Sequence, residues 1–192
     1  MTRTIPGHLR AAAAAGAIAV AIAGFAPASA QEPVMVGGAP MYADKTIAEN
    51  APNAENLSTL VAAVQAAGLV ETLGGEGPFT VFAPDNQAFS ALPAGTVDNL
   101  LKPENKEMLT HVLTYHVVAA NATSDAAMQM IKDGGGEHHV TTVSGDTLTL
   151  RMDGDNLIVI DETGNAATVT QADVTQGNGV VHVINEVLMP KM

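Results

Sequence analysis

The chain has 192 residues, with 8 Lys plus Arg against 20 Asp plus Glu, no Cys and no Trp. This length fits one domain, and the lack of Cys excludes a disulfide scaffold, a thiol nucleophile and a Cys-ligated metal site. The formal charge of −12 argues against a nucleic-acid partner, because affinity for phosphate backbones comes mainly from Lys and Arg.

Residues 1–30 have the features of a secretory signal peptide. Arg3 and Arg10 precede an apolar run over residues 11–26, and an Ala-Ser-Ala triplet ends at Ala30. The run consists mostly of small residues and is shorter than the roughly 20 apolar residues that a membrane-spanning helix needs. We therefore expect cleavage after Ala30, export to the periplasm or the outside of the cell, and no membrane insertion of the remaining chain.

Residues 31–44 follow, with two Pro, a Gly pair and no sustained hydrophobic period. This composition predicts a flexible linker. The remaining residues, 45–192, show no internal repeat, so we expect them to form one folded domain.

The first half of this domain has mainly helical periodicity. Apolar residues at helical spacing predict an amphipathic helix over 56–67, with Asn56 as its N-cap and Gly68 as the residue that ends it. Residues 79–82 form a short β-type run, after which Asp85 can cap a further short helix. A third helix is expected over 103–113, because Pro is favoured at a first helical position.

The second half changes to a period of two. Residues 115–118 are expected as a strand and 123–132 as a short helix, and an Asp-Gly turn at Asp153 predicts a hairpin. The strands expected after residue 140 include 147–152, 157–160, 167–174, 180–184 and 187–189. Helices followed by strands predict the α+β class.

Three blocks of the sequence resemble the motifs of the fasciclin domain family. Residues 77–89 read GPFTVFAPDNQAF and look like its first signature, and residues 178–190 read NGVVHVINEVLMP and look like its second. Between them, YHVV at 115–118 is similar to the Tyr-His motif of the family. The blocks follow the family's order and spacing, and the resemblance covers about residues 45–190.

The resemblance implies a wedge of β-strands flanked by a cluster of short helices, exported or displayed at a cell surface and acting in adhesion. The Tyr-His region is implicated in adhesion in this family, so Tyr115 and His116 are the candidate binding residues. The residues themselves leave a structural interpretation open, because a His within an apolar β-run is more often a hydrogen-bonded core residue.

Other chemistry has weaker support in the sequence. His111 lies five residues before His116, a spacing that does not place two imidazoles on one helical face. The adjacent His138 and His139 are expected in a solvated loop, or on opposite faces if they form a strand. A Ca²⁺ site among acidic turn residues remains an alternative, but the sequence predicts no cofactor and no metal site.

Nucleophilic catalysis is also disfavoured, because no Ser lies in a Gly-x-Ser-x-Gly elbow. We therefore predict a secreted, non-enzymatic adhesion module whose partner is a cell-surface or matrix protein or glycan. The alternative is a periplasmic protein that binds a small molecule or a metal, with an apolar pocket between the helices and the strands.

Overall fold

The computed structural model describes residues 32–93 and 95–191, which lie within one compact unit, Gln31–Met192. The predicted signal peptide lies outside the described residues. The α-helices are α1 (Ile47–Asn50), α2 (Ser58–Ala67), α3 (Val70–Leu73), α4 (Asn86–Ala91), α5 (Thr96–Leu100), α6 (Lys106–Tyr115) and α7 (Ser124–Asp133), and the short 3₁₀ helices are η1 (Ala51–Asn53), η2 (Glu55–Leu57) and η3 (Pro103–Asn105).

The strands form two sheets. A small hairpin contains β1 (Val34–Val36) and β2 (Ala39–Met41). The main sheet has the order β4-β3-β9-β8-β7-β6-β5, and its strands are β3 (Phe79–Pro84), β4 (Val117–Val118), β5 (Glu137–Thr141), β6 (Thr147–Asp153), β7 (Asn156–Ile160), β8 (Ala166–Gln176) and β9 (Gly179–Ile184). The described chain is therefore α+β, as the sequence predicts.

Strands β3 and β9 run parallel to each other, and every other neighbouring pair in the main sheet is antiparallel. Every residue of β9 is buried. Successive residues of a strand point to opposite faces. Each face of β9 is covered by its own cluster of apolar side chains. Val181 and Val183 join one cluster, and Ile184 joins the other.

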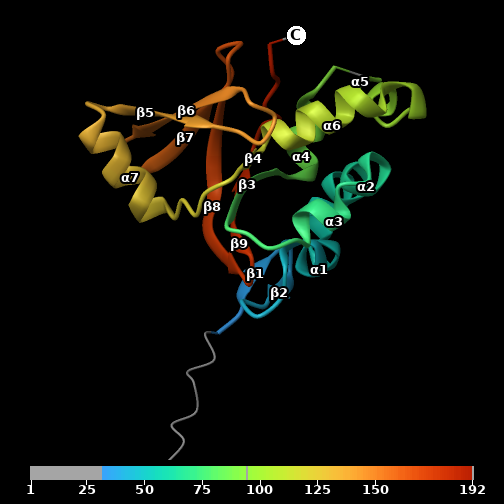
Figure 1. The fold of residues 1–192 in the computed structure, drawn as a ribbon, viewed down its shortest axis with the longest axis horizontal. Helices are drawn as coiled ribbons and strands as arrows, with labels where there is room; N and C mark the ends of the chain where they lie inside the picture. The colour runs from blue at the N-terminus through green and yellow to red at the C-terminus, as the bar shows by residue number, and fades with distance from the viewer. Residues whose placement is uncertain (1–31, 94, 192) are drawn as a thin grey trace, which may run out of the picture. The chain divides into compact units, whose positions relative to one another are not determined.

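We call these clusters the first core and the second core. The first core contains side chains of α1, α2, α3 and α6, together with Val81 of β3. The second core contains side chains of α7, β6 and β7, together with Phe82 of β3. Figure 1 shows this division, with α7 beside β5–β7 and the helices α1–α6 grouped near β3 and β4.

Several predicted elements are confirmed at the residue level. Asp85 caps α4, accepting a 2.8 Å hydrogen bond from the backbone N–H of Ala88. Helix α2 ends at Gly68, which adopts a left-handed conformation with φ of 76°. Strands β6 and β7 form the expected hairpin, in which Asp153 pairs with Asn156. Local turn and cap chemistry accounts for each of these features.

The expected linker over residues 31–44 is wrong in its central part, which forms the β1–β2 hairpin. Val36 and Met41 are buried in the first core. The side chain of Asn50 holds Tyr42, the residue after β2, since its Nδ2 donates to the carbonyl oxygen of Tyr42 at 2.7 Å. Three residues per strand are too few to produce a visible alternation, so the sequence pattern does not reveal this hairpin.

Other boundaries also differ from the expected ones. Tyr115 ends helix α6 and His116 is its C-cap, so the predicted strand at 115–118 is reduced to β4. His138 and His139 lie in β5 rather than in a loop. Residues 187–189 form no strand. The predicted N-cap is wrong as well, because Leu57 occupies that position and η2 precedes the helix.

Candidate functional site

The predicted binding residues lie at the end of α6, and Tyr115 is fully buried. Its hydroxyl donates to the carbonyl oxygen of Thr147 at 3.2 Å and accepts from the backbone N–H of Glu162 at 3.0 Å. Burial raises the pKa of Tyr115 to about 12, so the hydroxyl keeps its proton at physiological pH. The side chain thus fixes the start of β6 to the turn that follows β7.

His116 is also buried, with 2% of its surface exposed. Its Nδ1 lies 2.7 Å from the carbonyl oxygen of Val112, and its Nε2 lies 3.0 Å from the backbone nitrogen of Leu188. The amide of Leu188 must donate, so Nε2 is the acceptor and Nδ1 carries the proton. Burial lowers the pKa of His116 to about 4, which keeps the imidazole neutral.

Asp161 completes this group of polar residues near the C-terminal segment. Its carboxylate accepts from the backbone N–H of Met189 at 2.9 Å and from Thr163 and Asn165 in its own turn. Burial alone would raise the pKa of Asp161, but these hydrogen bonds hold it below its usual value. The carboxylate oxygens are therefore engaged by protein donors.

Neither Tyr115 nor His116 presents its side chain at the surface. Apart from the bond of His116 to Val112 in the same helix, their hydrogen bonds go to backbone groups of segments distant in sequence, at Thr147, Glu162 and Leu188. The periodicity of α6 explains the burial, because His116 lies three residues after Leu113 and continues the apolar stripe of the helix. Any part that these two residues take in binding a partner at the surface must therefore act through the segments that they hold.

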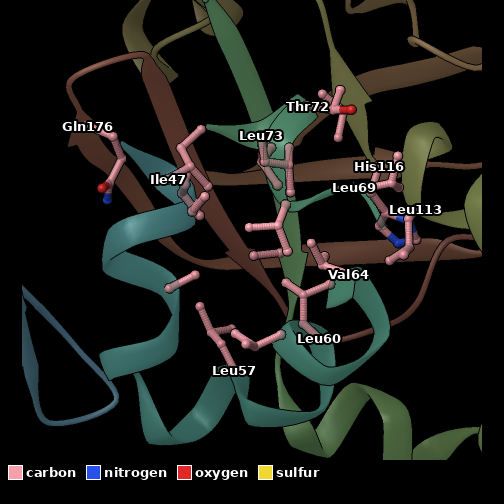
Figure 2. Close-up of a pocket in the computed structure, with 18 of the residues that line it drawn as sticks. Ile47, Leu57, Leu60, Val64, Leu69, Thr72, Leu73, Leu113, His116 and Gln176 are labelled. Carbon is pink, nitrogen blue, oxygen red and sulfur yellow. The ribbon is translucent and has the colours of Figure 1, made fainter. Parts of the chain in front are cut away.

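The ring of His116 also lines an apolar cavity between the helices and the main sheet. The cavity has a volume of about 90 Å³, and its apolar lining includes Ile47, Leu57, Leu60, Val64, Leu69, Leu73, Val81, Leu113, Val174 and Val181. Figure 2 shows Gln176 and His116 on opposite sides of this space, with Ile47 and Leu73 between them. The described residues of the lining include no Asp, Glu, Lys or Arg.

Two exposed valines belong to the same lining. Val70 in α3 and Val143 in the β5–β6 turn are 40% and 42% exposed, and Pro52, Gln65 and Thr72 of the lining are exposed too, so the cavity is open to the surface. The backbone N–H of Val143 donates to the carbonyl oxygen of Val117 at 2.7 Å, which fixes the turn beside β4. We call these two exposed valines, Val70 and Val143, the cavity mouth.

The remaining histidines take other positions. The Nε2 of His111 lies 2.7 Å from Oδ2 of Asp146, which also accepts from the hydroxyl of Ser144. The hydrogen bond from Ser144 and that from His111 lower the pKa of Asp146. Because the hydroxyl donates to the carboxylate rather than to the imidazole, these three side chains lack the relay of a nucleophilic triad.

Metal ligation has no evident site within residues 32–93 and 95–191. No group of three or more His, Asp or Glu side chains in these ranges is placed to hold a metal ion. His138 and His139 lie on opposite faces of β5, where His139 Nδ1 is 3.0 Å from the hydroxyl of Thr149.

None of the helices described is both long and apolar enough to cross a bilayer.

The sequence interpretation did not identify the residues at the cavity mouth. Val70 belongs to a helix of four residues, too short for a periodic pattern, and Val143 belongs to a turn. The sequence predicts a pocket between helices and strands only as a general alternative, without its lining residues. The only local signal is an apolar residue at each position, and exposed apolar residues are common on protein surfaces.

The fold and the site define a class of protein: a mixed β-sheet with a helix cluster against its central strands and an apolar cavity between them. The chain belongs to the fasciclin family, because the family model described as Fasciclin domain matches residues 55–190. The family resemblance expected from the three sequence blocks is thus confirmed.

Two relatives illustrate the range of this family. The chain is 50% identical over 147 residues to Protein sll1483 of a Synechocystis strain, covering 77% of this chain and 74% of that protein. It is 36% identical over 172 residues to the Cell surface glycolipoprotein MPB83 of Mycobacterium bovis, covering 87% of this chain and 70% of the relative.

A solved structure shares the fold. It is a FAS1 domain pair from the insect cell adhesion molecule Fasciclin I, with a TM-score of 0.54 and 25% sequence identity. The match covers 68% of this chain and 44% of the solved chain, so this chain spans less than half of that domain pair.

Proposed function

We propose that this protein is an exported, non-enzymatic adhesion module that binds a protein or glycan of a cell surface or extracellular matrix. Membership in the fasciclin family carries the proposal. The names of two similar proteins support it, since one is a cell surface glycolipoprotein and the other a cell adhesion molecule. Fold alone does not determine function, so binding must be measured.

The first experiment measures binding of residues 31–192 to intact cells and matrix of the source organism. We expect saturable binding by the native domain. Absence of saturable binding would contradict the adhesion proposal.

A matched pair of variants tests whether the Tyr-His region takes part. The chain has only two Tyr, of which Tyr115 is buried and Tyr42 is 42% exposed. Tyr115→Phe removes the hydroxyl that holds Thr147 and Glu162 but keeps the ring, and Tyr42→Phe is the control. We expect weaker binding only in Tyr115→Phe, with circular dichroism showing that both variants are folded. Equal binding by both variants would remove the Tyr-His region from the proposal.

A second candidate function, binding of a small molecule, is favoured by a separate observation. The apolar cavity beside His116 opens at the surface, as ligand sites commonly do. A molecule that copurifies with the native protein, detected by mass spectrometry after solvent extraction, would support this function.

A further inference from the structure

We propose that the cavity binds one end of an uncharged, predominantly hydrocarbon small molecule, which enters between Val70 and Val143. This inference rests on the second proposed function and names the ligand class and the route of entry. Three features of the cavity support it: its lining, its size and its mouth.

The lining selects against a charged ligand. No Asp, Glu, Lys or Arg side chain lies among the described residues around the cavity, so a buried charge would lack a partner. Both ring nitrogens of His116 are engaged by backbone groups of Val112 and Leu188. At the opposite side, the amide oxygen of Gln176 accepts a hydrogen bond from Asn50. Burial of hydrocarbon is therefore the main attraction that the cavity offers.

The size determines how much of a ligand can enter. The cavity volume is about 90 Å³, whereas engineered apolar cavities of about 150 Å³ hold a benzene molecule. The space is therefore too small for an aromatic ring but can take a short segment of a hydrocarbon chain, and a longer molecule would leave its polar end at the mouth.

The mouth gives the path of entry. Val70 and Val143 come from different elements, α3 and the β5–β6 turn, and both line the same cavity while remaining exposed. An exposed apolar pair at the entrance of an apolar cavity can contact the part of the ligand that stays outside. The hydrogen bond between Val143 and Val117 holds one side of this entrance in place.

The test uses the neutral fluorophore N-dodecyl dansylamide, whose alkyl chain is slender enough to enter the cavity while the fluorophore stays outside, with the native domain, residues 31–192. We expect a saturable rise in fluorescence with one site per chain. We also expect dodecanol to displace the probe more effectively than dodecanoate at neutral pH, because the lining offers no charge partner.

A double variant tests the mouth. Val70→Lys with Val143→Lys places two charges at the entrance, and both residues are exposed enough for the fold to tolerate the change. Met108→Lys is the matched control, because Met108 is 39% exposed and does not line the cavity. We expect the double variant to bind the probe at least about tenfold more weakly, and the control to bind as the native protein does.

The outcomes separate this inference from the function on which it rests. If a small molecule copurifies but dodecanoate competes better than dodecanol, or if the mouth variants bind the probe normally, small-molecule binding stands and the inference is wrong. If no molecule copurifies and no probe binds, both are wrong. Cell binding is measured independently and decides only the adhesion proposal.

Discussion

At the residue scale, the main feature is a neutral imidazole held inside the protein. His116 donates through Nδ1 to Val112 and accepts through Nε2 from Leu188. A proton added to Nε2 would meet the N–H of Leu188 and break that hydrogen bond. The Tyr-His motif therefore joins the end of α6 to the C-terminal segment of the domain.

This arrangement predicts a loss of stability in acid. Burial lowers the pKa of His116 to about 4 from its usual value of 6.5, so the unfolded chain binds the extra proton first as the pH falls. The contribution of His116 to the free energy of unfolding is complete above pH 6.5. It decreases between pH 6.5 and 4, by at most about 1.4 kcal/mol per pH unit. Urea unfolding at a series of pH values measures this slope.

His116→Gln provides the comparison, because it removes the titrating group and keeps an amide that can donate and accept. We expect the variant to show a smaller slope over this pH range. A residual slope is expected from His182, whose pKa is also lowered by burial. Identical slopes in the native protein and the variant would contradict the assignment.

At the element scale, the β1–β2 hairpin is part of the folded domain. Val36 is 2% exposed and belongs to the first core, whereas Val34 in the same strand is 36% exposed. The side-chain amide of Gln171 in β8 donates to the carbonyl oxygen of Met35 at 2.7 Å, which ties the hairpin to the main sheet. The β1–β2 hairpin therefore contributes to stability.

The two valines of β1 form a matched test. We expect Val36→Ala to lower the free energy of unfolding by roughly 2 kcal/mol, because it removes buried methyl groups from a packed core. Val34→Ala should change it by less than about 0.5 kcal/mol, since the side chain is partly in solvent. Chemical denaturation measures both values, and equal effects would show that the hairpin does not pack as described.

At the scale of the whole domain, β3 and β9 unite the two cores. These strands pair in parallel, with Val81 opposite Val181 and Phe82 opposite His182. Consecutive residues of β3 enter different cores, Val81 the first core and Phe82 the second core. Loss of one core would expose one face of both central strands, so the domain should unfold as one cooperative unit.

Substitutions in separate cores test this cooperativity. Leu109 belongs to the first core and Leu150 to the second, and both are buried. We expect Leu109→Ala and Leu150→Ala each to cost about 2–5 kcal/mol and to shift one common transition. Far-ultraviolet circular dichroism and tyrosine fluorescence should give coincident curves, and separate transitions in either variant would contradict a single unit.

The sequence by itself determined the α+β class, the family and most of the local structure. The Asp85 cap, the left-handed Gly68 at the end of α2 and the β6–β7 hairpin each depend on residues close together in the chain. Such features follow from backbone preferences and short-range hydrogen bonds, which a single segment already specifies.

Only the tertiary structure decided that Tyr115 and His116 are buried and that an apolar cavity opens beside them. The partners of His116 include Leu188, 72 residues away in sequence, and the mouth combines Val70 with Val143. Parallel pairing of β3 with β9 brings the two signature motifs together, and no local pattern encodes such a pairing. The site therefore depends on contacts between distant segments, whereas the elements that form it depend on near neighbours.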